Sequence, residues 1–408
     1  MRTIRILPAE VDDLPPLASI QRAAFAPTAI SRFIFGRVSP ESDARHSIQR
    51  LSKALDDPGK AVYKAVQSVD GEAAAIVGLA LWELPRQEGL PEEQEKPKKR
   101  KWPEGTDVEV AESFFSLMDF RPKERNYHLS ILAVDPQRQR TGAGKALLQW
   151  GCRQADKQGV PVDLKATDLG MPLYLRCGFR EFRDSIRGGV NGEIELFPMT
   201  RPALSLVPCT LADIPSLPQI YRLAFRPTAI NQYCFPNVTS EAYDRWITAR
   251  FTVALERRDE EGVKEEVMLA KRGDEVVGYA WYSFCPDLEQ RGRSTTPRTF
   301  PVGADQPRTS KFMAKFDEHK ETIKEAHWSF DNLAILPDAQ GQGLGRALSL
   351  KLLERAREDG VKVTLESTEL GLPLYEKLGY KRFKTPLVAD DLPDVEQLWP
   401  MVYEHELA

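Results

Sequence analysis

The chain has 408 residues, of which 42% are hydrophobic and 28% are charged, and its formal net charge at pH 7 is −4. This length exceeds that of one ordinary domain, and the slightly acidic balance argues against a general nucleic-acid binder, which usually carries a basic excess. No apolar run reaches the roughly 20 residues that cross a bilayer, and the N-terminal stretch lacks the apolar core of a secretory signal. We therefore expect a cytoplasmic protein that acts neither on nucleic acid nor in a membrane.

The first predicted elements, an opening strand and a helix, occur twice. Residues 6–25 match residues 206–225 without a gap, and the following AFAPTAISRFIFGRVSPE returns as AFRPTAINQYCFPNVTSE. A similar offset persists to the end of the chain, which indicates duplication of a complete domain. A solenoid would instead repeat every 20–50 residues or so. We predict two domains, residues 1–201 and 202–408.

Each half reads as mixed α/β. After the first helix come a second helix, a hairpin and a long charged insert, at residues 85–125 and 286–325. Each insert ends in a helix-like stretch with an apolar side, and we expect partly ordered flaps. A β-rich strand, a glycine-rich turn, an amphipathic helix, a short strand, a helix that begins at proline and closing strands complete each half.

The glycine-rich turns read PQRQRTGAG at residues 136–144 and PDAQGQGLG at residues 337–345. Each follows a predicted strand and opens a helix, where successive backbone N–H groups can hold a pyrophosphate. Glycine permits positive φ and a close approach of the phosphate. One such turn is equally well explained as a tight strand-to-helix connection, but two copies in the same context favour a binding site.

The pattern Gln-x-x-Gly-x-Gly in this position resembles the acyl-CoA signature of the GNAT superfamily of N-acyltransferases. The later stretches GMPLYLRCGF and GLPLYEKLGY resemble its second signature, so one GNAT unit is expected in each half. The resemblance implies an α/β fold with a mixed sheet that splays between its fourth and fifth strands. The implied acyl-CoA-binding residues are Leu132, Val134, Gln139, Arg140, Thr141, Gly142, Ala143, Gly144 and Lys145 in the first half and Leu333, Ile335, Gln340, Gly341, Gln342, Gly343, Leu344, Gly345 and Arg346 in the second.

The resemblance also implies direct transfer of an acetyl or other acyl group from CoA to an amine, without a metal. Family members commonly protonate the leaving thiolate with the tyrosine of the second signature, which is Tyr174 or Tyr375 here. The alternative is that each ring only packs its helix on the sheet.

The attacking amine must be neutral, so a base must accept its proton. If no bulge intervenes, strand alternation places Asp331 on one face with Ser329 and Leu333. Glu366 on the next strand is a second candidate. In the first half Ser130 and Lys165 occupy the equivalent positions, so we expect the C-terminal half to be the catalyst.

In the first half His128 is the remaining candidate base. Each of these polar strand residues also has a purely structural explanation, as a satisfied core group or a partner of neighbouring backbone. The aromatic residues of the duplicated segment, such as Phe35 and Phe235, are either an acceptor pocket or core packing.

The leading hypothesis is an acetyl-CoA-dependent N-acetyltransferase for a small-molecule amine. The alternatives are acetylation of protein lysines or N-termini, or a CoA-binding scaffold or sensor. We expect the two GNAT domains to pack as a pseudo-dimer within a monomeric chain. The basic run KPKKRK at residues 96–101 resembles a nuclear-import signal, although a solvated loop explains it better.

Overall fold

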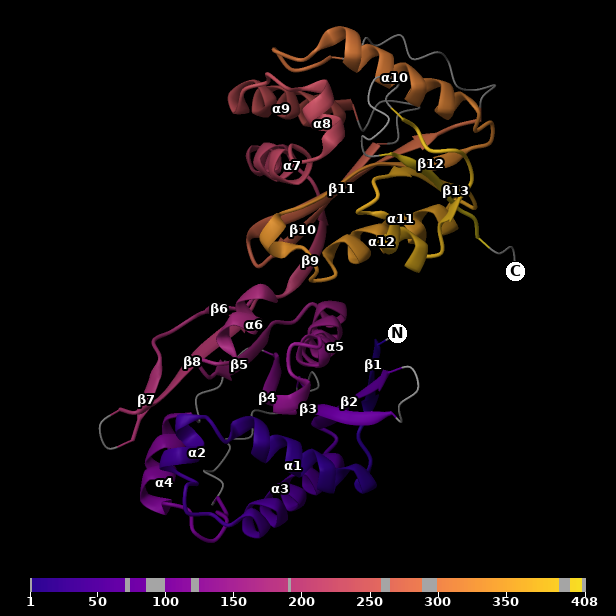
Figure 1. Cartoon of the computed structure of the whole chain (residues 1–408). Coiled ribbons are helices and arrows are strands. Elements are labelled where there is room, and N and C mark those ends of the chain that lie inside the picture. Colours follow the sequence, from indigo (N-terminus) through magenta and orange to yellow (C-terminus); the bar gives the residue numbers. More distant parts are fainter. Residues whose placement is uncertain are drawn as a thin grey trace. The chain divides into compact units, whose positions relative to one another are not determined.

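The computed structural model describes residues 2–69, 74–85, 100–118, 125–189, 192–257, 265–287, 299–388 and 397–405. Contacts divide the chain into two units, Met1–Leu204 and Ser205–Ala408 (Figure 1), and each unit is described by itself. Within the described residues, none of the helices has the length and apolar character that a membrane crossing requires.

The first unit is built on a mixed sheet with strand order β1-β2-β3-β4-β5-β8-β6, in which β7 also pairs with β8. Its elements in chain order are β1 (Arg2–Pro8), η1 (Val11–Asp13), α1 (Leu14–Phe25), α2 (Ala29–Phe33), α3 (Pro40–Leu55), β2 (Lys60–Val69), β3 (Ala75–Glu83), α4 (Val108–Leu117), β4 (Tyr127–Val134), η2 (Pro136–Arg138), α5 (Ala143–Gln158), β5 (Val162–Ala166), α6 (Met171–Arg176), β6 (Arg180–Glu181), β7 (Ile186–Gly188) and β8 (Ile194–Arg201).

Helices cover both faces of this sheet (Figure 1). On one face, α1 and α3 pack on β3 through Leu17, Leu51 and Leu79. On the other face, α5 packs so closely that a Cβ on Gly151 would lie 2.3 Å from a ring carbon of Trp82. Because both faces are covered, β3 contains six consecutive buried residues instead of an alternating pattern.

The second unit repeats this plan with strand order β14-β15-β13-β12-β11-β10-β9. Its elements in chain order are β9 (Leu204–Pro208), η3 (Leu211–Ser216), α7 (Leu217–Phe225), α8 (Ala229–Cys234), α9 (Ser240–Arg257), β10 (Glu265–Arg272), β11 (Glu275–Cys285), α10 (Gln306–Glu321), β12 (His327–Ile335), η4 (Pro337–Ala339), α11 (Leu344–Glu358), β13 (Lys362–Ser367), α12 (Leu372–Lys377), β14 (Lys381–Arg382) and β15 (Trp399–Tyr403).

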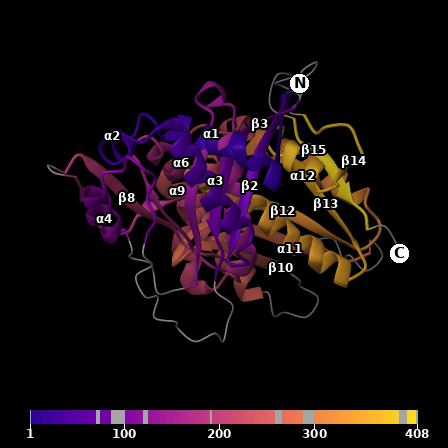
Figure 2. The ribbon, with the colours of Figure 1, turned by 90° about the horizontal axis from the view of Figure 1, so that it is seen from below.

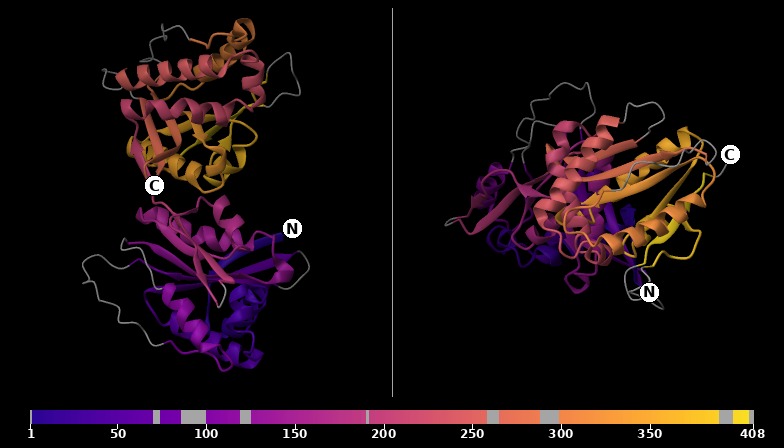
Figure 3. Two further views of the ribbon diagram at one scale, coloured as in Figure 1. Left: turned by 90° about the vertical axis from the view of Figure 1, so that its left-hand side faces the viewer. Right: turned by 90° about the horizontal axis from the view of Figure 1, so that it is seen from above.

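In this unit α7 and α9 run next to each other on one face of the sheet (Figure 3, left), and α11 lies against β12 on the other (Figure 2). The α7 and α9 side is an aromatic-rich core in which Tyr221, Tyr243 and Phe251 are buried. The α/β class and the mixed sheets expected from the sequence are therefore confirmed.

The predicted splay of the sheet is also confirmed. In the first unit β4 and β5 are parallel and pair over three residues, ending at Leu129 and Leu164. In the second unit β12 and β13 also pair over three residues, ending at Ser329 and Thr364. Beyond these points each pair of strands parts, and no described residues pair with the C-terminal half of the fourth strand on that side.

The duplicated segment forms the same structure in both units. Thr28 accepts a hydrogen bond from the backbone N–H of Ser31 at 3.3 Å and donates one to the carbonyl of Phe25 at 2.7 Å. Thr228 makes the matching pair of bonds, so each threonine caps a short helix, α2 or α8. The segment is therefore retained for its backbone geometry in both copies.

We expect Thr228→Ala to lower the free energy of unfolding by about 1 kcal/mol, because the first turn of α8 loses its side-chain cap. The measurement is urea denaturation followed by circular dichroism. Thr228→Ser is the matched control, because it keeps the hydroxyl that accepts and donates. Equal unfolding midpoints for the alanine and serine variants would contradict the assignment.

The helix predicted at the end of each insert is present, as α4 and α10. The backbone N–H of Asp107 donates to the carbonyl of Ile34, and that of Asp305 donates to the carbonyl of Cys234, both at 3.0 Å. The side chains of Asp107 and Asp305 then cap α4 and α10. The duplicated segment is thus the platform that anchors each inserted helix.

Most aromatic side chains of the duplicated segment pack inside the units, although Phe33 is exposed. Phe35 lies 6.2 Å from the ring of Trp102, and Phe235 lies 5.5 Å from that of Trp246. Tyr233 is buried against α10. These contacts are those of core packing. Of the basic run, residues 96–99 lie outside the described residues.

Candidate functional site

The glycine-rich turns have the backbone geometry that phosphate binding requires. Gly142 and Gly343 precede α5 and α11 with φ values of 98° and 89°, which favour glycine. A Cβ on Gly343 would meet nothing within 4 Å, so the space above this turn is open. The first N–H groups of each following helix have no intrahelical acceptor. Both turns are therefore suited to an anionic ligand.

The two turns differ at their first left-handed residue. Gly341 has φ 71°, whereas Arg140 takes the same place in the first unit with φ 61°. A left-handed residue other than glycine costs about 1–2 kcal/mol. The predicted glutamines do not point to a ligand: the amides of Gln139 and Gln340 donate to the carbonyls of Val134 and Ile335, at 3.3 and 3.2 Å. They tie each turn to the end of its strand.

A β-bulge changes the predicted face of the fourth strand. In the second unit Trp281 pairs with Asn332 and Tyr282 pairs with Phe330, so Asp331 is the extra residue. The first unit has the same shift, with Ser130 as the extra residue. Bulges of this kind place two residues opposite one and reorient those that follow.

The bulge moves Leu333 away from the face on which strict alternation placed it together with Asp331. Leu333 lies towards α11, where its Cδ2 atom would be 3.4 Å from a Cβ on Gly345. Asp331 instead contacts Ser283 and Ser329 on the α10 side of the sheet. The expectation of a shared face was wrong because it assumed an unbroken ladder.

The two signature tyrosines are buried in equivalent places. Tyr174 in α6 and Tyr375 in α12 are each 8% exposed, and Tyr375 packs edge-on against Phe330 with a centroid distance of 5.9 Å. Burial raises the pKa of both phenols well above their ordinary range. Each phenol therefore keeps its proton at neutral pH, as a proton donor must. The same burial also makes each ring part of the core.

On the α10 side of the second unit, Asp331 lies in a cluster of hydrogen-bond donors. Its Oδ2 atom accepts a hydrogen bond from Ser283, and its Oδ1 atom accepts one from Ser329 at 2.8 Å. The Nζ atom of Lys320 in α10 lies 3.3 Å from the same Oδ1. Asp331 raises the pKa of Lys320, so the lysine stays charged.

Glu366 on β13 lies beside the same helix. Its Oε1 atom is 3.7 Å from Nε2 of His319, and the side chains are 10% and 4% exposed. Burial raises the pKa of Glu366, although Lys320 opposes this shift. Burial, with the positive charges of Lys384 and Lys320, lowers the pKa of His319 to about 4, so its ring is neutral at pH 7. The structure thus brings Asp331 and Glu366, the two predicted carboxylates, to one lysine-bearing helix.

The first unit has different polar groups in the corresponding place. His128 Nδ1 lies 2.6 Å from Oδ2 of Asp163, and Asn126 donates to the other oxygen of Asp163. Ser130 donates to Glu83 at 2.7 Å.

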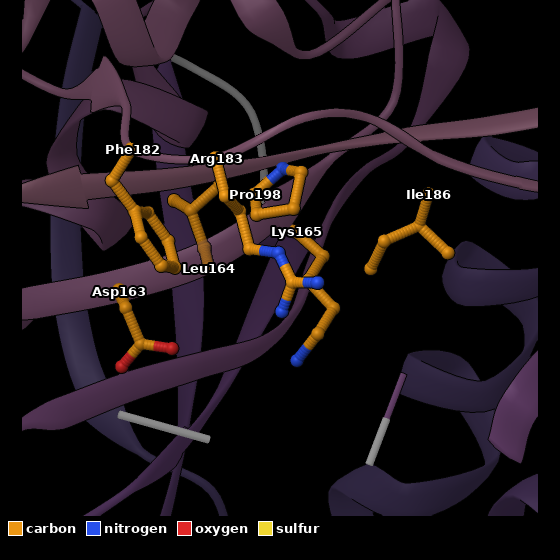
Figure 4. Close-up of a pocket in the computed structure, with 7 residues that line it drawn as sticks. All are labelled: Asp163, Leu164, Lys165, Phe182, Arg183, Ile186 and Pro198. Atoms are coloured by element: carbon orange, nitrogen blue, oxygen red, sulfur yellow. The ribbon is translucent and has the colours of Figure 1, made fainter. Parts of the chain in front are cut away.

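Lys165 and Asp163 line a small pocket, together with Arg183 (Figure 4). The pocket lies where β5 and β8 meet the loop after β6. Lys165 takes the place that Glu366 has in the second unit, whereas Arg183 corresponds to the equally basic Lys384. The two units therefore present different chemistry at the parting strands through this one exchange of charge.

Sequence reasoning missed four of these residues. His319 and Lys320 lie at the end of an insert helix, far from any signature, and only their place on that helix could have drawn attention to them. Glu83 and Asp163 correct the interpretation that the first half lacks acids here, although Asp163 is engaged by His128. No group of three or more His, Cys, Asp or Glu residues in the described ranges could hold a metal ion.

Comparison with known proteins identifies the family. Residues 231–380 match the model of the acetyltransferase (GNAT) family, and residues 109–201 match a model of an acetyltransferase (GNAT) domain. A stretch of 61 residues is 39% identical to glucosamine 6-phosphate N-acetyltransferase of Trypanosoma brucei brucei. That stretch spans 15% of this chain and only 42% of the relative's length.

Solved structures with a similar fold each cover about one unit. A histone acetyltransferase HPA2 and related acetyltransferase from Corynebacterium glutamicum is 22% identical with a TM-score of 0.33, and covers 49% of this chain and 97% of that chain. A PaiA N-acetyltransferase from Thermoplasma acidophilum in complex with coenzyme A is 11% identical with a TM-score of 0.33, and covers 50% and 99%. With a GNAT match in each unit, this chain belongs to the GNAT acetyltransferase family as a tandem of two GNAT domains.

Proposed function

We propose that the protein is an N-acetyltransferase that moves the acetyl group of acetyl-CoA to the amine of a small molecule, and that the C-terminal unit is the catalyst. One observation carries the choice of unit. Among the described residues, this unit alone places two partly buried carboxylates, Asp331 and Glu366, beside its parting strands together with a turn that has two left-handed glycines. The family's chemistry makes the turn the site for the CoA phosphates.

Each part of the reaction has a group in this unit. The turn from Gly341 to Arg346 supplies N–H donors to the cofactor's phosphates. In the part of the chain that the structure describes, no strand pairs with β12 near Leu333 and Ile335 on the β13 side, and the N–H groups of β12 there can bond the thioester oxygen as negative charge develops. Tyr375 is the proton donor to the leaving thiolate.

The amine loses its proton to a carboxylate on the α10 side. Asp331 and Glu366 are both in this partly buried cluster, and burial raises the pKa of Glu366 towards the range in which a base works at neutral pH. The first unit keeps a CoA-competent turn, from Gln139 to Lys145, but has Lys165 in place of Glu366. We propose that it binds CoA without the main transferase activity.

The test is incubation of the purified chain with acetyl-CoA and a panel of amines, with the acetylated products detected by mass spectrometry. The panel contains amino-sugar phosphates, prompted by the curated relative, together with alkyl and aryl amines and lysine peptides. Acetylation of a small amine supports the proposal. Preference for the peptides would indicate a protein acetyltransferase, and CoA binding without any product would indicate a scaffold or sensor.

A further inference from the structure

Helix α10 belongs to an insert, yet it brings two polar side chains to the candidate site. It is anchored at its start by the backbone bond from Asp305 to Cys234 and by packing of Phe312. At its other end, His319 and Lys320 reach Glu366 and Asp331. The helix is therefore held at both ends, and its C-terminal end is part of the site.

We propose that Glu366, paired with His319, accepts the proton of the acceptor amine. Lys320 is a positioning residue, which acts by holding Asp331. This inference rests on the proposed function and deepens it by separating the roles of the two carboxylates. In the step itself, one N–H bond of the acceptor ammonium breaks, its electron pair stays on nitrogen, and the proton passes to a carboxylate oxygen of Glu366.

The contacts of Asp331 make it the poorer acceptor. Hydrogen bonds from Ser283 and Ser329 and the ammonium of Lys320 occupy its two oxygens. A carboxylate with several donors and a paired cation is stabilised in its charged form. Its contacts with two hydroxyl groups and one ammonium suit a residue that orients neighbouring groups.

The position of His319 suits a hydrogen bond from a protonated Glu366. Its Nε2 atom is buried and has no hydrogen-bond partner among the described residues, and it faces Oε1 of Glu366 at 3.7 Å. A buried ring nitrogen without a hydrogen-bond partner lowers the stability of the native state, so its presence calls for a functional explanation. When Glu366 takes a proton, a hydrogen bond to Nε2 becomes available and stabilises the protonated form.

The charges around this pair come from several elements. Lys320 and Asp331 act on Glu366, and Lys384 acts on His319 from the segment after β14. The ring of Phe383 lies 5.4 Å from that of His319 and shields it from water. Further out, Glu265 interacts with Asp331, and Cys285 interacts with Lys320. Both nearby cations lower the pKa of His319 and favour its neutral form, so the ring can accept a hydrogen bond from a protonated Glu366.

The experiment compares the pH dependence of kcat/KM for four proteins. The wild type should lose activity as the pH falls and the base becomes protonated. Glu366→Gln should lower kcat/KM by about 10²–10⁴-fold. It should also abolish the fall in activity at low pH, which is the acidic limb of the pH profile. Asp331→Asn should lower the rate but keep the limb. Glu325→Gln is the matched control, because this carboxylate lies on the surface with 72% of its side chain exposed, and it should match the wild type.

Lys320 is tested by Lys320→Met and Lys320→Arg. The methionine variant should lower kcat/KM by about 10–100-fold, as loss of an orienting partner does. It should also move the acidic limb of the pH profile to higher pH, because Lys320 no longer lowers the pKa of Glu366. The arginine variant should restore part of the rate. Loss of the acidic limb in Asp331→Asn with its retention in Glu366→Gln would overturn the inference while leaving the proposed function intact. A wild type that acetylates no amine overturns both.

A second measurement needs no turnover. Burial and two nearby lysines lower the pKa of His319 from 6.5 to about 4. Between these pH values the ring is protonated in the unfolded chain but stays neutral in the native state. This group therefore makes the native state less stable as the pH falls from 6.5 towards 4. In denaturant titrations, His319→Gln should lose less stability than the wild type between pH 6.5 and 5. Parallel losses would show that the native ring titrates as it does in the unfolded chain, and would overturn its role as the neutral partner of Glu366.

Discussion

Replacing Tyr375 with phenylalanine is expected to lower turnover by about 10²–10⁴-fold, whereas Tyr174→Phe should have a much smaller effect. The two rings have the same burial, and burial raises the pKa of both hydroxyls. A difference between the variants therefore reports what surrounds each tyrosine rather than the tyrosine itself. Only Tyr375 shares its unit with the cluster of Glu366 and Lys320.

The measurement is steady-state acetylation at saturating acetyl-CoA, and Tyr174→Phe is the matched control for the loss of one buried hydroxyl. A crippling effect of Tyr174→Phe instead would make the first unit the catalyst. His128 would then be its base, with Asp163 at 2.6 Å orienting the imidazole as in other carboxylate–histidine pairs. Equal partial losses would show two working sites.

Much of the fold followed from patterns that local chemistry explains. The glycines of the two turns, the paired signatures and the constant offset predict two mixed α/β units with a splayed sheet, and the register confirms the splay. The inserted helices were also predictable, because each has an apolar side. These features depend on residues near one another in sequence.

The side chains at the site were harder to predict. A bulge at Asp331 leaves the sequence pattern unchanged, and residues 327–330 are all buried because both faces of β12 are covered, which removes the usual alternation. The meeting of His319 with Glu366 depends on how α10 packs, which no local pattern encodes. Asp163 was overlooked because its partner, His128, lies on another strand.

The duplicated segment shows why aromatic residues alone were a poor guide to an acceptor pocket. Its shared threonine caps a short helix in each unit, and its backbone carbonyl at Ile34 or Cys234 holds the inserted helix. Both tasks are needed whether or not a unit is catalytic. The two copies therefore stayed alike while the side chains at the parting strands diverged.

Both turns keep the left-handed glycine that precedes the helix, Gly142 or Gly343. We therefore expect two CoA molecules to bind per chain and Gly343→Val to remove one of them. Isothermal titration of the wild type should give a stoichiometry near two, and of the variant near one. A β-branched residue is strained at the left-handed φ of 89°, and its side chain would project into the space that a phosphate must approach.

The matched control for Gly343→Val is Gly360→Val. Gly360 follows α11 with φ 68°, and a Cβ there also meets nothing within 4 Å, so both variants carry backbone strain without a clash inside the protein. Only the ligand distinguishes them. If Gly360→Val keeps two sites while Gly343→Val keeps one, the lost site is the turn itself. Retention of two sites in Gly343→Val would mean that CoA does not bind above this glycine, and the catalytic assignment of the second unit would fall with it.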